Sequence, residues 1–196
     1  QAWKDALAAD PVSAFGGVLV TNTPLDIACA REINSLFFEV ILAPEYEKEA
    51  LELLETKKNR IILQMRQICL PDRTFRSALN GVLEQSKDLK TETVPDMKPV
   101  TLDVPDGEEL DDLVFANKIV KHSRSNAIVL AKNKQLLASG IGQTSRIDAL
   151  KQAIAKARAF GLDLQGAVMA SDAFFPFADS VEIAHAAGIT AIVQPG

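Results

Sequence analysis

Short apolar runs alternate with helix-like stretches along most of this chain, and that alternation constrains its fold more than any other feature. The apolar runs have the length of buried strands and lie at 18–20, 39–44, 60–63, 127–131, 167–170 and 190–193. Between them, segments such as 106–120 and 146–160 repeat apolar residues at helical spacing. Strands that alternate with helices in the sequence form layered α/β folds. The sequence therefore predicts the α/β class.

Composition narrows the class of protein further. With 196 residues, 47% hydrophobic and 24% charged, the chain is globular and long enough for one domain or two small ones. The net charge of -5 argues against a nucleic-acid-binding surface, and no apolar run reaches the length of a membrane span. Cys29 and Cys69 are too few for a disulfide framework or a zinc site. We expect a cytoplasmic protein without zinc, nucleic-acid or membrane partners.

Residues 167–179 combine a strand-like run with polar and aromatic residues. The apolar run ends abruptly at Ser171 and Asp172, and three phenylalanines follow before Asp179, which is expected to open a helix. Aromatic residues at this position can simply plug the edge of a sheet, and the residues alone favour that interpretation. The carboxyl end of a strand is, however, also where open α/β sheets bind ligands. An aromatic wall beside two carboxylates would suit a flat heteroaromatic ring with N–H donors.

A second candidate site lies at the start of the helix expected after Ser145. Ser145 suits an N-cap, and Asp148 stands three residues further on, as in a capping box. Arg146 is unusual there, because a cation in the first turn opposes the helix dipole. A bound anion would explain it, and an arginine that reaches into solvent explains it equally well. We expect this helix start to share a pocket with Phe174 and Asp179.

The polar segment 121–126 precedes an expected strand. Lys121 and His122 could form a general acid/base pair, but the better interpretation is a helix C-terminus with favourable cations. The short polar residues Ser123, Ser125 and Asn126 could line a pocket, or hold a monovalent cation together with Asp172.

The remaining pattern predicts further elements and a division of the chain. Helices are expected at 1–9, 24–37, 45–57 and 178–187, a strand at 80–85, and a hairpin turn at Asn133–Lys134. Paired glycines at 16–17 would permit positive φ. Residues 88–105 contain three prolines and many charges, and are expected to connect two halves. The first helix lacks a preceding cap residue, so we expect that the chain is part of a longer one.

Several motifs in a fixed order resemble one known family. They are Asp10–Gly17 (DPVSAFGG), Glu39–Pro44 (EVILAP), Lys121–Ile128 (KHSRSNAI), Gly142–Arg146 (GQTSR), Ala170–Phe177 (ASDAFFPF) and Gly188–Gly196 (GITAIVQPG). Together they resemble the formyltransferase half of the bifunctional purine-biosynthesis family AICAR transformylase/IMP cyclohydrolase. The resemblance covers essentially the whole chain and is weakest between 65 and 105.

The resemblance implies a fold, an activity and partners. The family's formyltransferase half has two related subdomains with a cytidine-deaminase-like three-layer α/β/α fold but no zinc. Residues 1–105 would be part of the first subdomain plus a connection, and residues 106–196 part of the second. The family works as a homodimer that moves a formyl group from 10-formyltetrahydrofolate to AICAR, the carboxamide ribotide. A separate cyclohydrolase domain then closes the ring to IMP.

The same resemblance assigns site residues by position. AICAR contacts would be Ser13, Phe15, Gly16, Glu39, Asn126, Arg146 and Asp179. Contacts to the folate co-substrate would be Ile147, Phe174 and Gly196. A potassium ion would lie at Ser123, Ser125 and Asp172.

The chain also departs from the family pattern. The family's catalytic lysine–histidine motif is not found, and the residues after Lys121 and His122 match a family motif whose own lysine and histidine are not the catalysts. We therefore expect that these residues alone do not transfer formyl groups. Ala178 stands where an arginine is common, and the turn before Gln143 lacks a glycine. A non-catalytic nucleotide-binding or interaction module that keeps the fold is the alternative.

Overall fold

The computed structural model describes residues 1–66 and 71–196, so Cys69 lies outside the described residues. The chain forms two compact units, which are described separately. Unit 1 comprises Gln1–Ala14 and Glu92–Gly196, and unit 2 comprises Phe15–Thr91. Both combine helices with strands, which confirms the predicted α/β class. The cytidine-deaminase-like fold and the expected subdomains 1–105 and 106–196 stay predictions.

Unit 1 is built on a four-stranded mixed sheet. Its strand order is β7 (Gln135–Gly140), β6 (Ile128–Lys132), β8 (Ala167–Ser171) and β9 (Ile189–Val193). The strand β6 is antiparallel to both of its neighbours, whereas β8 and β9 run parallel. Ile128, at the start of β6, pairs with Ser171 at the end of β8. The polar residues that follow β8 therefore lie beside those that precede β6.

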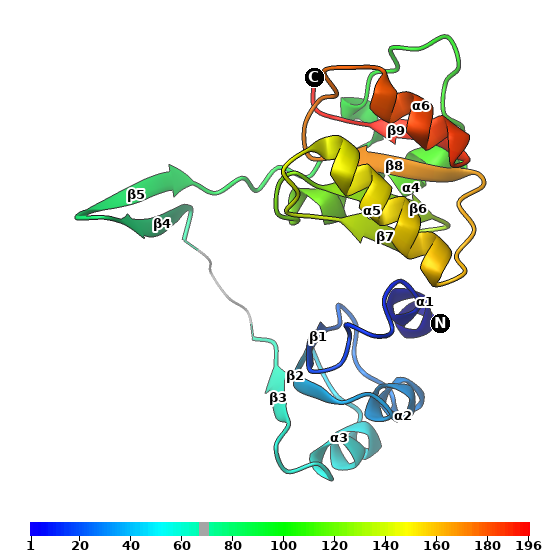
Figure 1. The fold of residues 1–196 in the computed structure, drawn as a ribbon. Helices are drawn as coiled ribbons and strands as arrows, with labels where there is room; N and C mark the ends of the chain where they lie inside the picture. Colours follow the sequence, from blue (N-terminus) through cyan, green and yellow to red (C-terminus); the bar gives the residue numbers. More distant parts are fainter. Residues whose placement is uncertain (67–70) are drawn as a thin grey trace. The chain divides into compact units, whose positions relative to one another are not determined.

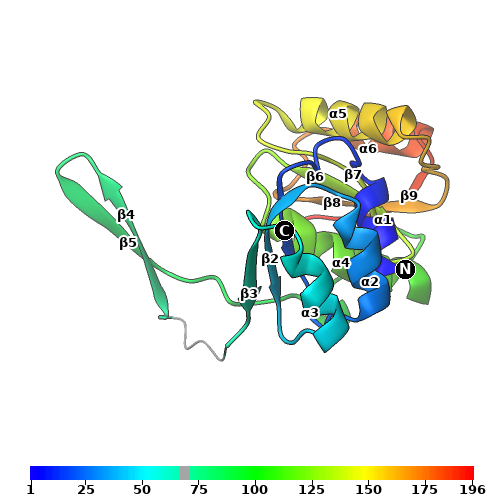
Figure 2. The same ribbon diagram turned by 90° about the horizontal axis from the view of Figure 1, so that it is seen from below.

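Helices cover both faces of this sheet (Figures 1 and 2). The helices α5 (Arg146–Ala159) and α6 (Asp179–Ala186) lie on one face, and α4 (Gly107–Lys121) lies on the other. One apolar cluster, which includes Leu130 and Met169, fills the space under α5 and α6. A second, which includes Val129 and Val168, lies against α4. Successive residues of a strand point to opposite faces, so β6 and β8 supply both clusters and are apolar up to their last residues, Lys132 and Ser171.

Caps and a tight turn fix the ends of these elements. Asp106 caps α4 in a reciprocal capping box with Glu109, and Ser145 caps α5. The predicted hairpin turn between β6 and β7 is confirmed, because Asn133 and Lys134 have φ values of 54° and 56°. The buried carboxylate of Asp112 accepts both of their backbone N–H groups, at 2.7 and 2.6 Å. Helix α4 therefore holds the turn in place.

The first helix, α1 (Ala2–Ala8), also belongs to unit 1. Gln135 of β7 donates from Nε2 to the carbonyl of Asp5 at 3.1 Å. The carboxylate of Asp10 pairs with Lys156 of α5 at 2.5 Å and accepts the N–H of Ser13 at 2.8 Å. Burial raises the pKa of Asp10, but the hydrogen bonds from Lys156 and Ser13 outweigh it and lower that pKa to about 2.

Unit 2 contains a three-stranded parallel sheet in the order β1 (Gly17–Val20), β2 (Phe38–Ala43) and β3 (Ile61–Gln64). The helices α2 (Ile27–Asn34) and α3 (Lys48–Glu55) lie on one side of it (Figures 1 and 2). The opposite face, called the open face below, consists of aliphatic side chains in register. They are Val18, Val20, Val40, Leu42, Ile61 and Leu63.

Two helix starts expected in unit 2 were wrong. Helix α2 begins at Ile27 and not near Pro24, because Asp26 accepts the N–H of Cys29 at 2.6 Å and acts as the N-cap. Helix α3 begins at Lys48 and not at Glu45, because the chain around Tyr46 forms a parallel β-bridge with Leu25.

Unit 2 also contains a two-stranded sheet, in the part of the sequence with the weakest pattern. The strands β4 (Arg73–Ala78) and β5 (Gly81–Ser86) form an antiparallel hairpin, in which only β5 was expected. Further along, Val94–Asp96 forms a short 3₁₀ helix in the segment expected to be a plain connection. None of the helices in residues 1–66 and 71–196 combines the length and the apolar character that a membrane crossing requires.

Candidate functional site

Asp172 is the centre of the polar cluster in unit 1. It follows the end of β8, and its N–H donates to the carbonyl of Ala127 at 3.2 Å. In return, its Oδ1 accepts the N–H of Ala127 at 3.0 Å. These two bonds fix the carboxylate at the edge of the sheet, beside the start of β6.

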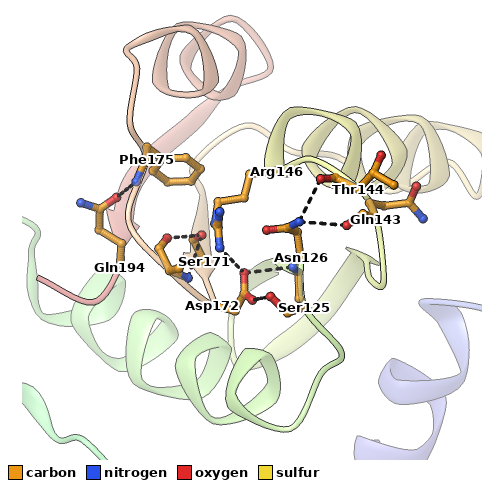
Figure 3. Close-up of polar contacts among 11 residues, drawn as sticks. Ser125, Asn126, Gln143, Thr144, Arg146, Ser171, Asp172, Phe175 and Gln194 are labelled. Atoms are coloured by element: carbon orange, nitrogen blue, oxygen red, sulfur yellow. Dashed lines mark hydrogen bonds and ion pairs between the residues drawn. The ribbon is translucent and has the colours of Figure 1, made fainter.

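The carboxylate of Asp172 has two further side-chain partners (Figure 3). Its Oδ2 accepts a hydrogen bond from the hydroxyl of Ser125, and its Oδ1 lies 3.6 Å from Nη2 of Arg146. The side chain of Arg146 is 22% exposed and that of Asp172 is 13% exposed, so water screens this ion pair only in part. The cation in the first turn of α5 thus faces an anion of the protein itself, which neither interpretation of the sequence included.

Asn126 is held in one orientation by the turn opposite (Figure 3). Its Nδ2 donates to the carbonyls of Gln143 and Thr144, at 2.9 and 3.2 Å. Two acceptors at these positions require the NH₂ end of the amide, which uses both of its donors. The amide oxygen is therefore the atom of this side chain that remains to accept a hydrogen bond from a ligand.

The turn opposite Asn126 joins β7 to α5 and depends on a glycine. Gly142 has a φ of 67°, and its N–H donates to the carbonyl of Arg124 at 2.7 Å. Ser145 accepts the N–H of Asp148 at 3.1 Å, as expected of an N-cap. The carboxylate of Asp148 accepts the hydroxyl proton of Ser145 instead of closing the expected capping box. The turn at Gly142 and the cap bond from the N–H of Asp148 to Ser145 determine that α5 begins at Arg146.

The aromatic turn after Asp172 divides into buried and exposed parts. Phe175 packs against the apolar cluster under α5 and α6, and its N–H donates to Oε1 of Gln194 at 2.8 Å (Figure 3). For Phe175 the plug interpretation is therefore correct. Phe174 and Phe177 are 59% and 72% exposed, which leaves their rings accessible to a ligand. Asp179 is exposed and opens α6, as expected. A pocket shared by Arg146, Phe174 and Asp179 stays a prediction.

The residues expected at a potassium site only partly converge. Ser125 and Asp172 meet, but the hydroxyl of Ser123 donates to the carbonyl of Ile119 in the last turn of α4, at 2.9 Å. The positive charge of Arg146 near Oδ1 also disfavours a second cation there. The expected ligands therefore fit a potassium ion only in part. Within residues 1–66 and 71–196, no three His, Cys, Asp or Glu residues form a group that could hold a metal.

Lys121 and His122 lie where the more ordinary interpretation placed them. Helix α4 ends at Lys121, and His122 is its exposed C-cap. A cation at the carboxyl end of a helix interacts favourably with the helix dipole. This arrangement confirms the helix C-terminus for the pair.

The other expected contacts are spread over both units. In unit 2, Gly16 has a φ of 75°, Phe15 stacks on Phe37 with ring centroids 4.8 Å apart, and Glu39 is exposed on β2. In unit 1, Ser13 follows α1, Ile147 lies half-buried in the first turn of α5, and Gly196 is exposed at the last residue. A hydrogen bond and an ion pair join three of the expected residues, namely Ser125, Asp172 and Arg146, and Asn126 follows Ser125 in the chain. The carbonyls of Gln143 and Thr144 were not anticipated, because a main-chain acceptor leaves no signal in the sequence.

Comparison with known proteins places this arrangement in a family. The family model described as "AICARFT/IMPCHase bienzyme" matches residues 1–156. The chain belongs to this family. A relative from Bacteroides thetaiotaomicron, named "Bifunctional purine biosynthesis protein PurH", is 67% identical over all 196 residues of the chain. Relatives of the same name from Caldicellulosiruptor saccharolyticus and Aquifex aeolicus are 47% and 46% identical, again over the whole chain. The chain spans only 38–39% of the length of these members of the AICARFT/IMPCHase bienzyme family.

Proposed function

We propose that this chain is part of an AICAR formyltransferase that acts in purine biosynthesis and takes its formyl group from 10-formyltetrahydrofolate. Family membership supports the proposal, as does the name of the relatives, which describes a bifunctional purine biosynthesis protein. The observation that carries it is the placement of Asn126 and Arg146, two of the expected AICAR contacts, around the single carboxylate of Asp172.

The polar cluster suits the recognition of AICAR. Asn126 offers an amide oxygen to an N–H or O–H of the ligand, because its donors are already used. Arg146 offers the N–H donors of a partly buried guanidinium group, and charge-assisted hydrogen bonds of this kind are strong. By the resemblance, Ser13 and Asp179 of unit 1 would also contact AICAR. The resemblance separately assigns AICAR contacts to Phe15, Gly16 and Glu39 of unit 2. The folate would contact Ile147, Phe174 and Gly196.

The chemistry requires a proton acceptor besides these contacts. In the proposed reaction the AICAR amine attacks the formyl carbon, a new C–N bond forms, and the bond from that carbon to the folate nitrogen breaks. The amine loses a proton and the folate nitrogen gains one. His122 caps the end of α4 through its backbone and is not proposed as the acceptor. General acid/base catalysis contributes about 10²–10⁴-fold. We therefore propose that residues 1–196 alone do not transfer formyl groups, and that the active form is a cytoplasmic homodimer of a longer chain.

The experiment is a formyl-transfer assay with AICAR and 10-formyltetrahydrofolate, on residues 1–196 and on the longer gene product that contains them. We expect turnover by the longer product only. In that product His122→Ala should keep activity within about threefold of the wild type, because the residue lies at a helix end. Absence of formyl transfer in the longer product would contradict the proposed function. Turnover by residues 1–196 would contradict the proposal that these residues lack the catalytic pair.

A further inference from the structure

We propose that Asp172 is a positioning residue for AICAR, which holds Arg146 and the backbone on both sides of Asn126 in their binding geometry. The inference rests on the proposed function and adds a role for a residue that the resemblance assigns only to a potassium ion. It starts from the number of partners that the one carboxylate has.

The partners of Asp172 come from two segments of the chain. On one side Ser125 and Ala127 bond to the carboxylate, so the residues before and after Asn126 are both fixed to it. On the other side stands the guanidinium of Arg146, 3.6 Å from Oδ1. The side-chain amide of Asn126 also donates hydrogen bonds to the loop that leads into α5. The carboxylate therefore sets the separation between two proposed AICAR contacts.

Electrostatics give this arrangement its strength. The Nε of Arg146 is buried and has no hydrogen-bond partner among the described residues. In the described part of the chain, Asp172 is the carboxylate recorded in an ion pair with this guanidinium. Removing one charge of a partly buried pair leaves the other uncompensated, and a long arginine side chain then samples other rotamers. Loss of the Asp172 charge should thus release Arg146 while leaving the sheet, which pairs through backbone groups, intact.

The test is steady-state kinetics of the longer gene product, with Asp172→Asn as the isosteric variant. We expect the KM for AICAR to rise about tenfold, kcat to stay within about threefold, and the KM for the folate to stay unchanged. Arg146→Ala should raise the KM for AICAR at least as much. The double variant should be no worse than Arg146→Ala alone, because the isosteric asparagine keeps an oxygen for the N–H of Ala127 and removes the charge that Arg146 faces.

Matched controls separate this role from a general loss of charge or of fold. Asp148→Asn removes a carboxylate from the first turn of the same helix, where it accepts a hydrogen bond from the cap residue Ser145, and should leave the KM for AICAR unchanged. Additive effects in the double variant, or an equal effect of Asp148→Asn, would overturn the proposal. The proposal would also be overturned if Asp172→Asn lost the dependence of activity on potassium but kept a normal affinity for AICAR.

A second measurement uses residues 1–196 and needs no activity. Heteronuclear NMR of the arginine Nε–H groups should show one resonance, assigned to Arg146 by Arg146→Lys, that Asp172→Asn shifts and Asp148→Asn does not. An unshifted resonance contradicts the ion pair in solution. If the longer product transfers no formyl group, the proposed function is wrong, and the positioning role of Asp172, which rests on it, is wrong too. If transfer is normal but Asp172→Asn has no effect on the KM for AICAR, only the positioning role fails.

Discussion

The two larger sheets of this chain differ in how many of their faces are covered. In unit 1, helices lie on both faces, and every residue of β8 is buried. In unit 2, the helices lie on one side, and the open face leaves Val18 and Val20 at 68% and 64% exposure and Ile61 at 53%. Parallel sheets are normally covered on both faces. The sheet of unit 1 is thus packed on both faces, whereas the sheet of unit 2 has one apolar face that is exposed to solvent.

In the described residues, the polar cluster around Asp172 lies on the sheet that is packed on both faces. A side chain at the edge of a fully packed sheet is held in position by that sheet. Asp172 is held in this way by its two hydrogen bonds with the backbone of Ala127. The open face lacks such support on one side. An apolar surface of this kind marks an interaction site in ordinary soluble proteins. The homodimer expected from the family would offer one cover, and it stays a prediction.

The largest expected contrast is between matched leucines of the two sheets. Leu130→Ala empties part of the cluster under α5 and α6 and should cost about 2–5 kcal/mol in the free energy of unfolding. Leu63→Ala on the open face, where the side chain is 46% exposed, should cost less than about 1 kcal/mol. Urea denaturation of both variants measures the difference. Equal losses would mean that the open face is covered in solution.

The second contrast concerns two glycines of unit 1. A Cβ atom at Gly140, on β7, would lie 1.9 Å from the carbonyl oxygen of Ala149, so α5 would have to move. We expect Gly140→Ala to destabilise the protein by about 1–3 kcal/mol. At Gly107 a Cβ would meet nothing within 4 Å, and alanine there should be neutral or stabilise helix α4 by up to about 1 kcal/mol. Melting temperatures of the two variants compare them directly. A harmless Gly140→Ala would show that the contact between β7 and α5 is loose.

The third prediction tests the open face itself. Val20→Lys adds a charge to it and should change the free energy of unfolding by less than about 0.5 kcal/mol, because the position is exposed. It should lower self-association of the chain in sedimentation velocity runs at high concentration. Glu49→Gln changes the net charge by the same amount on α3 and serves as the control. A wild type that stays monomeric at every concentration would show that the open face does not drive pairing.

The fourth contrast compares an ion pair of each unit. Because the folded-state pKa of Asp10 is about 2, below its ordinary value of 3.8, its pair with Lys156 stabilises the protein above about pH 4. This contribution is lost as the pH falls through about 2. Asp10→Asn should therefore cost about 1 kcal/mol at pH 7 and much less at pH 2, where about half of the Asp10 carboxyls are protonated.

In unit 2 the pair of Lys48 and Glu52 is largely exposed, at 82% and 62%. Glu52→Gln should change stability by less than about 0.5 kcal/mol at any pH, because exposed pairs contribute little. Urea titrations of both variants across the acid range provide the measurement. An effect of Asp10→Asn that does not change with pH would contradict the role of its charge.

Much of unit 1 could be predicted from the sequence, because its signals are local or periodic. The continuous apolar runs of β6 and β8, the cap at Ser145 and the turn at Asn133–Lys134 all appear where they were expected. A buried strand and a capped helix each leave a pattern within a few residues. The family match confirmed the resemblance that the motifs indicated.

The rest depended on contacts between residues far apart in the sequence. Nothing near Arg146 indicates that Asp172 would be its partner, because the pair forms only when β8 ends beside the turn into α5. The strand β4 has only two apolar residues, Phe75 and Ala78, and is defined by its pairing with β5.

The most direct test of the account is AICAR binding by two arginine variants of helix α5. Isothermal titration of the longer gene product with AICAR would compare Arg146→Ala, in the first turn, with Arg158→Ala, exposed in the last turn. Losing a charged hydrogen-bond donor typically costs about 1.5–3 kcal/mol, so Arg146→Ala should weaken binding about 10- to 100-fold. Arg158→Ala should bind within about twofold of the wild type. Equal affinities of the two variants, or a wild type that does not bind AICAR, would contradict the proposed site.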